Sequence, residues 1–322
     1  MRHDRLSVRG GRGAAASVGR YMAKNRRHRR FFYVVSVLGK VWQHPNNRDR
    51  RLRACAKAVG WQAYKRTVRR PIEVGAYGGM KVRCYPDSTA ASDLIYFGGL
   101  YEYDEMSFCR RYLRAGDTAI DGGANIGTFT LFLSDLVRPG GRVIAIEPDP
   151  TAAERLRENV SNNGLDSSVE VIQAAVAKQQ GTASFSTGWD VANHLVQGQA
   201  QDRSVEVPTT TLDLVAADLG EIAFAKLDLE GGEHHALMGA SILLGGGSVM
   251  TWMIEGIDWR IREAGGSHSE MLALLTHSGY GFATYDVRGR HLRRLNADEV
   301  TMTNFFAISQ THWSLVEQRL AE

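Results

Sequence analysis

The sequence predicts an α/β fold in which a doubly wound, mostly parallel sheet carries helices on both faces and ends in a terminal antiparallel hairpin. From residue 118 onward, short apolar runs typical of strands alternate with apolar residues at helical spacing. The run 222–229 is largely apolar, as expected for a strand that is covered on both faces. The last two strand patterns, at 281–287 and 303–308, are expected to pair across residues 288–302.

The first 92 residues form a separate region of the sequence. Residues 1–30 are rich in Arg, Gly and Ala and are predicted to form a basic, disordered arm. Residues 31–92 are predicted to form an extension of helix and β structure. Apolar residues recur there at helical spacing over 31–70, with a break at 44–47, and alternate around Gly-rich turns at 72–86.

Residues 93–312 are predicted to form the main domain, and residues 313–322 a C-terminal tail. Three glycines at 245–247 stop one predicted helix, and Ser269 can cap another. The predicted elements are strands at 118–120, 143–147, 169–172, 222–229 and 249–255, helices at 129–136, 151–162, 211–219, 233–244 and 270–278, and short β pieces between 182 and 210.

The charge of the chain is unevenly distributed. Residues 1–70 carry 20 Lys or Arg and 2 Asp or Glu, a net charge of +18, whereas the remainder has a net charge of −14. This split predicts a basic arm on an acidic body. The three Cys are scattered without metal-binding spacing, and no secretory signal or apolar run of roughly 20 residues is present. A cytoplasmic location with reduced thiols is therefore expected, with membrane association through the arm as an option.

A glycine-rich segment between the first strand of the sheet and the helix after it is the most informative motif. It reads Asp-Gly-Gly-Ala-Asn-Ile-Gly from Asp121 to Gly127, and Glu147 ends the next strand twenty residues later. Glycines before a helix let a ligand approach the backbone, and an acid at the end of the second strand can accept hydrogen bonds from ribose hydroxyls. The segment therefore predicts a site for an adenosine-containing cofactor.

The spacing of these glycines separates two kinds of cofactor. Dinucleotide-binding turns follow G-x-G-x-x-G, but here Ala124 or Asn125 occupies the second glycine position. The pattern D-x-G-x-N-x-G instead favours S-adenosylmethionine (SAM), because Asp121 would repel a pyrophosphate but can face the cationic methionine end. The residues expected to contact the cofactor are Asp121, Gly122, Gly123, Ala124, Asn125, Gly127, Glu147, Pro148, Gln173, Ala174 and Asp228.

Carboxylates end several predicted strands, at the edge where open parallel sheets bind ligands. Lys226, Asp228 and Glu230 alternate along one strand, and polar groups in such a strand are costly unless they are paired or functional. The candidate bases for a substrate hydroxyl are Asp228, Glu230 and His234. No metal site is assigned, although a divalent metal held by these carboxylates is an alternative way to acidify the hydroxyl. The residues expected on the substrate side are Lys226, Glu233, Glu255 and His194.

Seven sequence blocks, in order over residues 95–310, resemble those of the FkbM-type SAM-dependent methyltransferases. The blocks are Asp121-Gly-Gly-Ala-Asn-Ile-Gly-Thr-Phe-Thr, Ala145-Ile-Glu-Pro-Asp-Pro, Thr210-Thr-Leu-Asp213, Lys226-Leu-Asp-Leu-Glu-Gly-Gly-Glu233, Leu237-Met-Gly-Ala240, Ile254-Glu255 and Thr303-Asn-Phe-Phe306. The resemblance implies a class I methyltransferase Rossmann-like fold and methyl transfer to a hydroxyl oxygen of a sugar or natural product. It implies SAM contacts at Asp121, Gly123, Asn125, Gly127 and Glu147. It also implies a signature cluster of the family at Lys226, Asp228, Glu230 and Glu233.

The expected partner is a hydroxyl acceptor on a small molecule, a glycan or a lipid-linked glycan. A nucleic-acid methyltransferase is a rival, because basic arms bind phosphates, but the Asn/Asp-Pro-Pro-aromatic motif of base methylation is absent and nucleic acid is not expected. A peripheral membrane module is a second rival. Residues 20–70 combine basic and aromatic side chains that can bind an anionic membrane surface.

Overall fold

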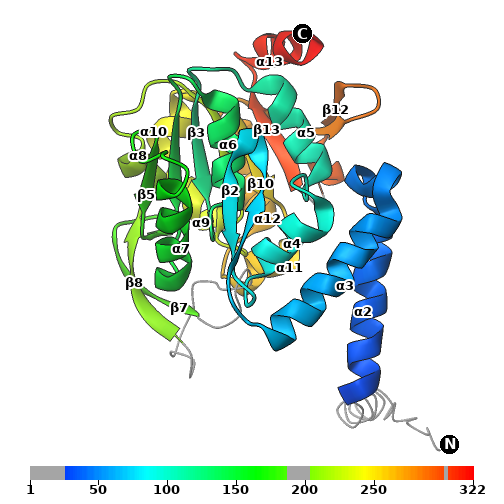
Figure 1. Ribbon diagram of the computed structural model, residues 1–322. Helices are drawn as coiled ribbons and strands as arrows, with labels where there is room; N and C mark the ends of the chain where they lie inside the picture. Colours follow the sequence, from blue (N-terminus) through cyan, green and yellow to red (C-terminus); the bar gives the residue numbers. More distant parts are fainter. Residues whose placement is uncertain (1–25, 187–203, 301–303) are drawn as a thin grey trace, which may run out of the picture.

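The computed structural model describes residues 26–186, 204–300 and 304–322, with side chains from residue 34 onward in these ranges. Its centre is an eight-stranded sheet (Figure 1). In sheet order the strands are β12 (His291–Leu295), β11 (Tyr280–Asp286), β13 (Asn304–Ser309), β10 (Val249–Glu255), β9 (Ile222–Leu227), β3 (Thr118–Gly122), β4 (Arg142–Ile146) and β5 (Val169–Ile172). The five strands from β10 to β5 are parallel, and the other pairings are antiparallel. The predicted mostly parallel α/β fold is therefore confirmed.

Helices cover both faces of this sheet and create two apolar cores. One core packs α3 to α7 and α13 against the sheet, and the other packs α8 to α12 against the opposite face. The helices are α2 (Arg26–Gln43), α3 (Arg51–Thr67), α4 (Thr89–Phe97), α5 (Tyr103–Tyr112), α6 (Thr128–Val137), α7 (Pro150–Ser161), α8 (Leu212–Val215), α9 (Glu233–Met238), α10 (Ser241–Gly245), α11 (Asp258–Glu263), α12 (His268–His277) and α13 (Trp313–Ala321). Because β9 is buried along its whole length, its apolar sequence is explained by helices on both of its faces.

Two small sheets and three short 3₁₀ helices complete the described chain. The strands β1 (Ile72–Gly75) and β2 (Lys81–Cys84) form an antiparallel pair. The strands β6 (Ala175–Val176), β8 (Ser204–Thr210) and β7 (Gly181–Ser186) form a three-stranded sheet beside the end of β5. The 3₁₀ helices are η1 (Pro45–Arg50), η2 (Tyr77–Gly79) and η4 (Ala297–Glu299).

The N-terminal extension is a pair of helices, α2 and α3, joined by η1 at the predicted break. It is tied to α4 by buried hydrogen bonds: the Trp61 indole N–H donates to Ser92 Oγ at 3.0 Å, and Asn47 Nδ2 donates to the Tyr96 carbonyl at 2.9 Å. Residues 1–25 of the predicted arm lie outside the described residues. None of the described helices meets the length and apolar content that a membrane crossing requires.

Three local predictions need correction. The segment 288–302, expected to be only a connection, contains β12, which pairs with β11 on the side away from β13. The single helix predicted at 233–244 is two helices. The chain passes so close to the Ala177 carbonyl that a Cβ on Gly239 would lie 2.3 Å from its oxygen, and the helix ends there. Ser267 caps α12, not Ser269: its Oγ accepts from the Glu270 N–H at 3.2 Å.

Candidate active site

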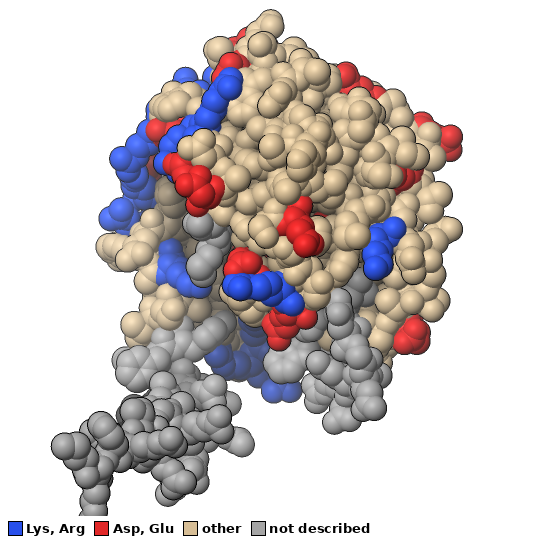
Figure 2. All heavy atoms as spheres, turned by 180° about the vertical axis from the view of Figure 1, so that it is seen from behind, with Lys and Arg blue, Asp and Glu red and all other residues tan. Residues whose placement is uncertain are grey.

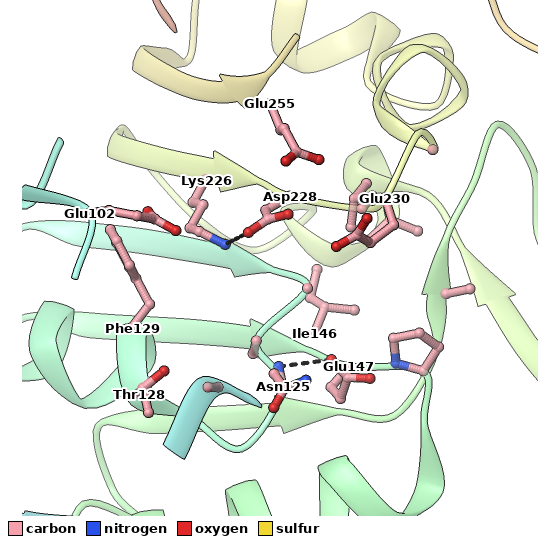
Figure 3. Close-up of a pocket in the computed structure, with 18 of the residues that line it drawn as sticks. Glu102, Asn125, Thr128, Phe129, Ile146, Glu147, Lys226, Asp228, Glu230 and Glu255 are labelled. Carbon is pink, nitrogen blue, oxygen red and sulfur yellow. Dashed lines mark hydrogen bonds and ion pairs between the residues drawn. The ribbon is translucent and has the colours of Figure 1, made fainter. Parts of the chain in front are cut away.

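A pocket opens at the carboxyl ends of β3, β4, β9 and β10, where an open parallel sheet is expected to bind its ligand. It brings together residues that are more than 100 positions apart in the sequence (Figure 3). The predicted residues that line it are Gly123, Ala124, Asn125, Glu147, Pro148, Ala174, Lys226, Asp228, Glu230 and Glu255.

The glycine-rich loop between β3 and α6 forms one wall of the pocket. Gly123 has a φ of +78°, and a Cβ on it would lie 2.0 Å from the Asp228 carbonyl oxygen. Gly127 has a φ of +87°, and its Cβ would lie 2.5 Å from Leu156 Cδ1. Gly123 therefore requires glycine for two reasons, the left-handed backbone and the close approach to a backbone oxygen, whereas Gly127 requires it mainly for the left-handed backbone. Asn125 is also left-handed, with a φ of 48°.

Glu147 is held in the pocket by backbone groups. Its Oε2 accepts from the Asn125 N–H at 2.8 Å, and its Oε1 accepts from the Asp149 N–H at 2.8 Å. Burial raises the pKa of Glu147 to about 7, against the effect of these two donors. Each carboxylate oxygen has two lone pairs, so one on each oxygen is left for a ligand. The side chain can therefore accept from a pair of neighbouring hydroxyls, such as those of a ribose.

Lys226 is a buried cation at the centre of the site. Its Nζ lies 2.9 Å from Asp228 Oδ2 and 4.0 Å from Asp121 Oδ1, and 5.4 Å from the centre of the Phe129 ring. Burial alone would lower the pKa of Lys226, but the two carboxylates raise it above its usual value. The ammonium therefore stays charged and fixes the Asp228 carboxylate beside the glycine-rich loop.

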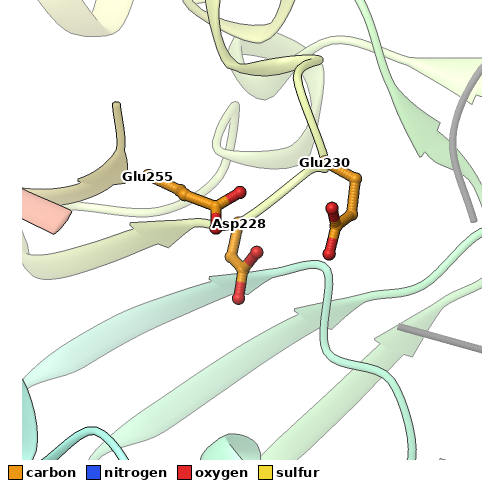
Figure 4. A group of neighbouring side chains, drawn as sticks. All are labelled: Asp228, Glu230 and Glu255. Atoms are coloured by element: carbon orange, nitrogen blue, oxygen red, sulfur yellow. The ribbon is translucent and has the colours of Figure 1, made fainter. Parts of the chain in front are cut away.

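Three carboxylates gather on the other side of the pocket (Figure 4). Asp228, Glu230 and Glu255 each bring an oxygen within 4.8 Å of the others, close enough to hold a cation together. Arg260 of α11 already supplies one: its Nη1 lies 3.0 Å from Glu255 Oε2 and also pairs with Glu230. Burial, followed by repulsion from Asp228, raises the pKa of Glu230 to about 8 and also raises the pKa of Glu255.

Glu233, predicted on the substrate side, and His234, predicted as a candidate base, lie outside the pocket lining. Glu233 is fully buried, and its Oε1 accepts from the N–H groups of Leu229 at 2.7 Å and Gly231 at 3.2 Å. It braces the turn that carries Glu230. His234 is buried, and its Nδ1 accepts from the Ser267 N–H at 3.0 Å. His234 therefore supports the segment before α12 and does not line the pocket with the other two candidate bases, Asp228 and Glu230.

Asp121, Gly122 and Gln173, which were predicted as cofactor contacts, do not line the pocket. Asp121 has no exposed surface, and its Oδ2 accepts from the Thr130 hydroxyl at 2.7 Å while Oδ1 faces Lys226. Gly122 packs β3 closely against β9, because a Cβ on it would lie only 3.0 Å from the Lys226 carbonyl oxygen. Gln173 accepts from Arg157 at 3.2 Å. His194 lies outside the described residues.

Several lining residues were not predicted from the sequence. Among them are Tyr101 and Glu102 before α5, Thr128 and Phe129 of α6, Phe185 of β7 and Arg260 of α11. Thr128 and Phe129 directly follow the glycine-rich loop, and their position could have indicated them. Glu102 and Arg260 stand on elements with no motif, and only the tertiary structure brings them to the site.

A family model described as "Methyltransferase FkbM domain" matches residues 121–282, half of the chain. The chain belongs to this family. It is 29% identical over 211 residues to 31-O-demethyl-FK506 methyltransferase FkbM of Streptomyces tacrolimicus, covering 53% of this chain and 74% of that protein. It is 44% identical over 57 residues to a protein-L-isoaspartate O-methyltransferase of Aeropyrum pernix, but spans only 22% of that protein and 18% of this chain.

A solved FkbM methyltransferase from Methylobacillus flagellatus is 13% identical, with a TM-score of 0.37, over 79% of this chain and 59% of that one. The family match confirms the predicted resemblance, and the protein is a SAM-dependent methyltransferase of the FkbM family. The cofactor expected from the glycine spacing is therefore that of the family.

Proposed function

We propose that this methyltransferase transfers the methyl group of SAM to a hydroxyl oxygen of a sugar, a glycolipid or another hydroxylated natural product. The observation that carries this proposal is the group of three carboxylates beside the glycine-rich loop. Carboxylates accept hydrogen bonds from hydroxyls and can remove their protons. The relative that acts on 31-O-demethyl-FK506 supports an oxygen acceptor.

The cofactor is proposed to lie along the glycine-rich loop. Its ribose hydroxyls would reach Glu147, and the adenine would lie among the neighbouring apolar residues Pro148 and Ala174. Asp121, Gly122 and Gly127 shape this wall from behind, and Gln173 lies further along the same edge. The bound SAM supplies an electrophilic methyl group at a sulfonium, which this placement directs toward Asp228.

The acceptor is proposed to enter from the side of Glu230 and Glu255. The chain must hold the acceptor oxygen in line with the methyl group at near-attack distance and take its proton. Glu230 is the proposed base, because its pKa of about 8 makes it a stronger base than an ordinary carboxylate while it is still ionised in part near neutral pH. Asp228 and Glu255 are left to accept hydrogen bonds from other hydroxyls of the acceptor.

The first experiment is a calorimetric titration of the protein with S-adenosylhomocysteine, with NADH as the control. Saturable binding of S-adenosylhomocysteine alone is expected. The protein is then incubated with SAM carrying an isotope-labelled methyl group and a panel of hydroxylated glycans, glycolipids and natural products. Labelled methyl ethers are the expected products. Labelled amines or carbon-methylated products, without labelled ethers, would contradict the oxygen acceptor and leave the cofactor assignment standing.

We further propose that α2 and α3 bind the enzyme to an anionic membrane surface, where a lipid-linked acceptor would be accessible to it. Four large apolar side chains on the described part of this helix pair are exposed: Val35 by 49%, Trp42 by 43%, Leu52 by 78% and Val59 by 51%. Basic side chains gather toward this side of the molecule (Figure 2). The exposed ones on the described part of the pair and its connection are Lys40, Arg48, Arg50, Arg53, Lys57 and Arg66. Exposed apolar groups beside basic ones suit an anionic interface.

Vesicle sedimentation tests this second proposal. The protein is expected to bind phosphatidylcholine vesicles that contain phosphatidylserine, and added salt should weaken the binding. Leu52→Glu should reduce it. Leu214→Glu is the matched control, because Leu214 is an equally apolar residue, 50% exposed, on α8. Equal binding to neutral and anionic vesicles, or equal effects of the two substitutions, would contradict this role.

A further inference from the structure

Glu102 is an acid that lines the pocket and has no role in the proposed reaction. It occupies the N-cap position of α5 and lines the pocket together with Tyr101, Phe129 and Lys226. Figure 3 shows it at the end of the pocket opposite Glu147, with its carboxylate facing inward. It comes from the start of α5, an element separate from both the glycine-rich loop and β9.

The carboxylate of Glu102 lacks a cationic or hydrogen-bonding partner on one side. Its Oε2 is buried, and within the described part of the chain nothing donates a hydrogen bond to it. Lys226, the nearby cation, points its ammonium at Asp228, 2.9 Å away. Burial raises the pKa of Glu102 to about 8, although the charge of Lys226 opposes this. An unsatisfied buried carboxylate is costly, so its presence in a pocket indicates a ligand that supplies the donor.

The position of Glu102 matches one particular end of the cofactor. If the ribose lies at Glu147, the glycine-rich loop leads the rest of the cofactor toward Thr128, Phe129 and Glu102. That end is an amino acid, with an ammonium and a carboxylate. α6 begins at Thr128 after Gly127, which has no side chain to cap it, so the first N–H groups of the helix can receive the carboxylate. Glu102 is then left for the ammonium.

We infer that Glu102 binds the α-ammonium group of the methionine portion of SAM and of S-adenosylhomocysteine. The inference rests on the cofactor placement proposed above. The Tyr101 hydroxyl, 3.1 Å from Thr128 Oγ1, links the segment that carries Glu102 to the start of α6. Two neighbouring elements thereby bind the two charged groups of the amino acid. Glu102 binds the ammonium, and the N–H groups at the start of α6 bind the carboxylate. Glu102 is a cofactor-binding residue in this account and takes no part in the chemical step.

Calorimetry with two ligands tests this inference. S-adenosylhomocysteine carries the ammonium, and 5′-methylthioadenosine has the same nucleoside without the amino acid. Glu102→Gln should weaken S-adenosylhomocysteine binding by roughly 10- to 100-fold, as expected for loss of a charged hydrogen bond, and leave 5′-methylthioadenosine affinity unchanged. Glu105→Gln is the matched control, because Glu105 is another partly buried acid of α5 and lies outside the pocket lining. It should alter neither affinity.

Proton release supplies a second readout in the unaltered protein. Glu102 is partly protonated at pH 7 and would ionise when it receives an ammonium, so S-adenosylhomocysteine binding should release protons, measured as a dependence of the binding enthalpy on the buffer. An analogue without the α-amino group should bind more weakly and release fewer. Equal loss of both ligands in Glu102→Gln, or equal affinity of the analogue, would overturn the inference. Failure of the unaltered protein to bind S-adenosylhomocysteine would instead overturn the cofactor placement.

Discussion

The two ends of the pocket are built in different ways. At the cofactor end, backbone N–H groups of Asn125 and Asp149 hold Glu147, and Gly123 lets the loop pass the end of β9. At the acceptor end, side chains hold side chains: Arg260 pairs with Glu230 and Glu255, and Lys226 pairs with Asp228. Backbone geometry leaves few sequence solutions, whereas ion pairs between side chains can be rearranged by single substitutions. We therefore expect a rigid cofactor end and an adaptable acceptor end.

The largest effect is expected from removing the proposed base. Glu230→Gln should lower kcat by roughly 10²- to 10⁴-fold, the usual contribution of a general base, with S-adenosylhomocysteine affinity unchanged. Because only ionised Glu230 can accept a proton, the rate of the unaltered enzyme should rise with pH and level off above a midpoint near 8. The variant should lose this rise.

Glu263→Gln is the control, since Glu263 is an exposed acid of α11. Nearly full kcat in Glu230→Gln would contradict Glu230 as the base and would indicate Asp228 instead.

At the cofactor end, a substitution that disturbs the backbone is expected to prevent cofactor binding. Gly123→Ala combines a left-handed backbone with an overlap with the Asp228 carbonyl, and should lower the free energy of unfolding by roughly 2–5 kcal/mol while abolishing S-adenosylhomocysteine binding. Gly164→Ala separates the two causes, because Gly164 has a φ of +65° but open space around its Cβ position. It should cost only about 1–2 kcal/mol and leave binding intact.

Thermal unfolding and calorimetry measure these two quantities. Similar losses in both glycine variants would show that the close approach to β9 matters little.

A milder change at the same end concerns Glu147. In Glu147→Gln one amide N–H₂ must face a backbone N–H, because both oxygens of the native carboxylate accept from the backbone. S-adenosylhomocysteine affinity should fall by roughly 10- to 100-fold, since a charged hydrogen bond is lost. Calorimetry measures the change, and an unaltered affinity would contradict the proposed contact between the ribose and Glu147. Glu154→Gln, at an exposed position of α7, serves as the control.

The same contrast explains what could be predicted from the sequence. β5 and β10 were predicted at their observed bounds, and the loop from Asp121 to Gly127 was identified, because period-2 patterns and glycine spacing act locally along the chain. Glu102 and Arg260 were missed because nothing local distinguishes them. Only the packing of their helices brings them to the pocket.

The signature segment after β9 shows the limit within a single motif. Strand alternation predicted one face for Lys226, Asp228 and Glu230, and all three reach the pocket. The strand, however, ends at Leu227, and Glu230 has a φ of 53°, so a turn delivers it rather than the alternation. Glu233 holds that turn from behind. The motif in the sequence thus indicated the site. It could not show which of its acids line the pocket and which hold the backbone in place.

The smallest predicted effect tests whether ion pairs tune the acceptor end. The positive charge of Arg260 opposes the rise in the pKa of Glu230 that burial and the neighbouring acids cause. Arg260→Gln should therefore raise that pKa further, and the midpoint of the rise in kcat with pH should move to higher pH by up to about one unit. The rate at pH 7 should fall, because less Glu230 is ionised, and a rate measured well above the midpoint should recover. Arg262→Gln is the control, because Arg262 pairs with Asp258 at the surface of the same helix. S-adenosylhomocysteine affinity should stay the same in both variants. A midpoint that stays in place, or moves to lower pH, would mean that Arg260 does not act on the base and that the acceptor end is held as rigidly as the cofactor end.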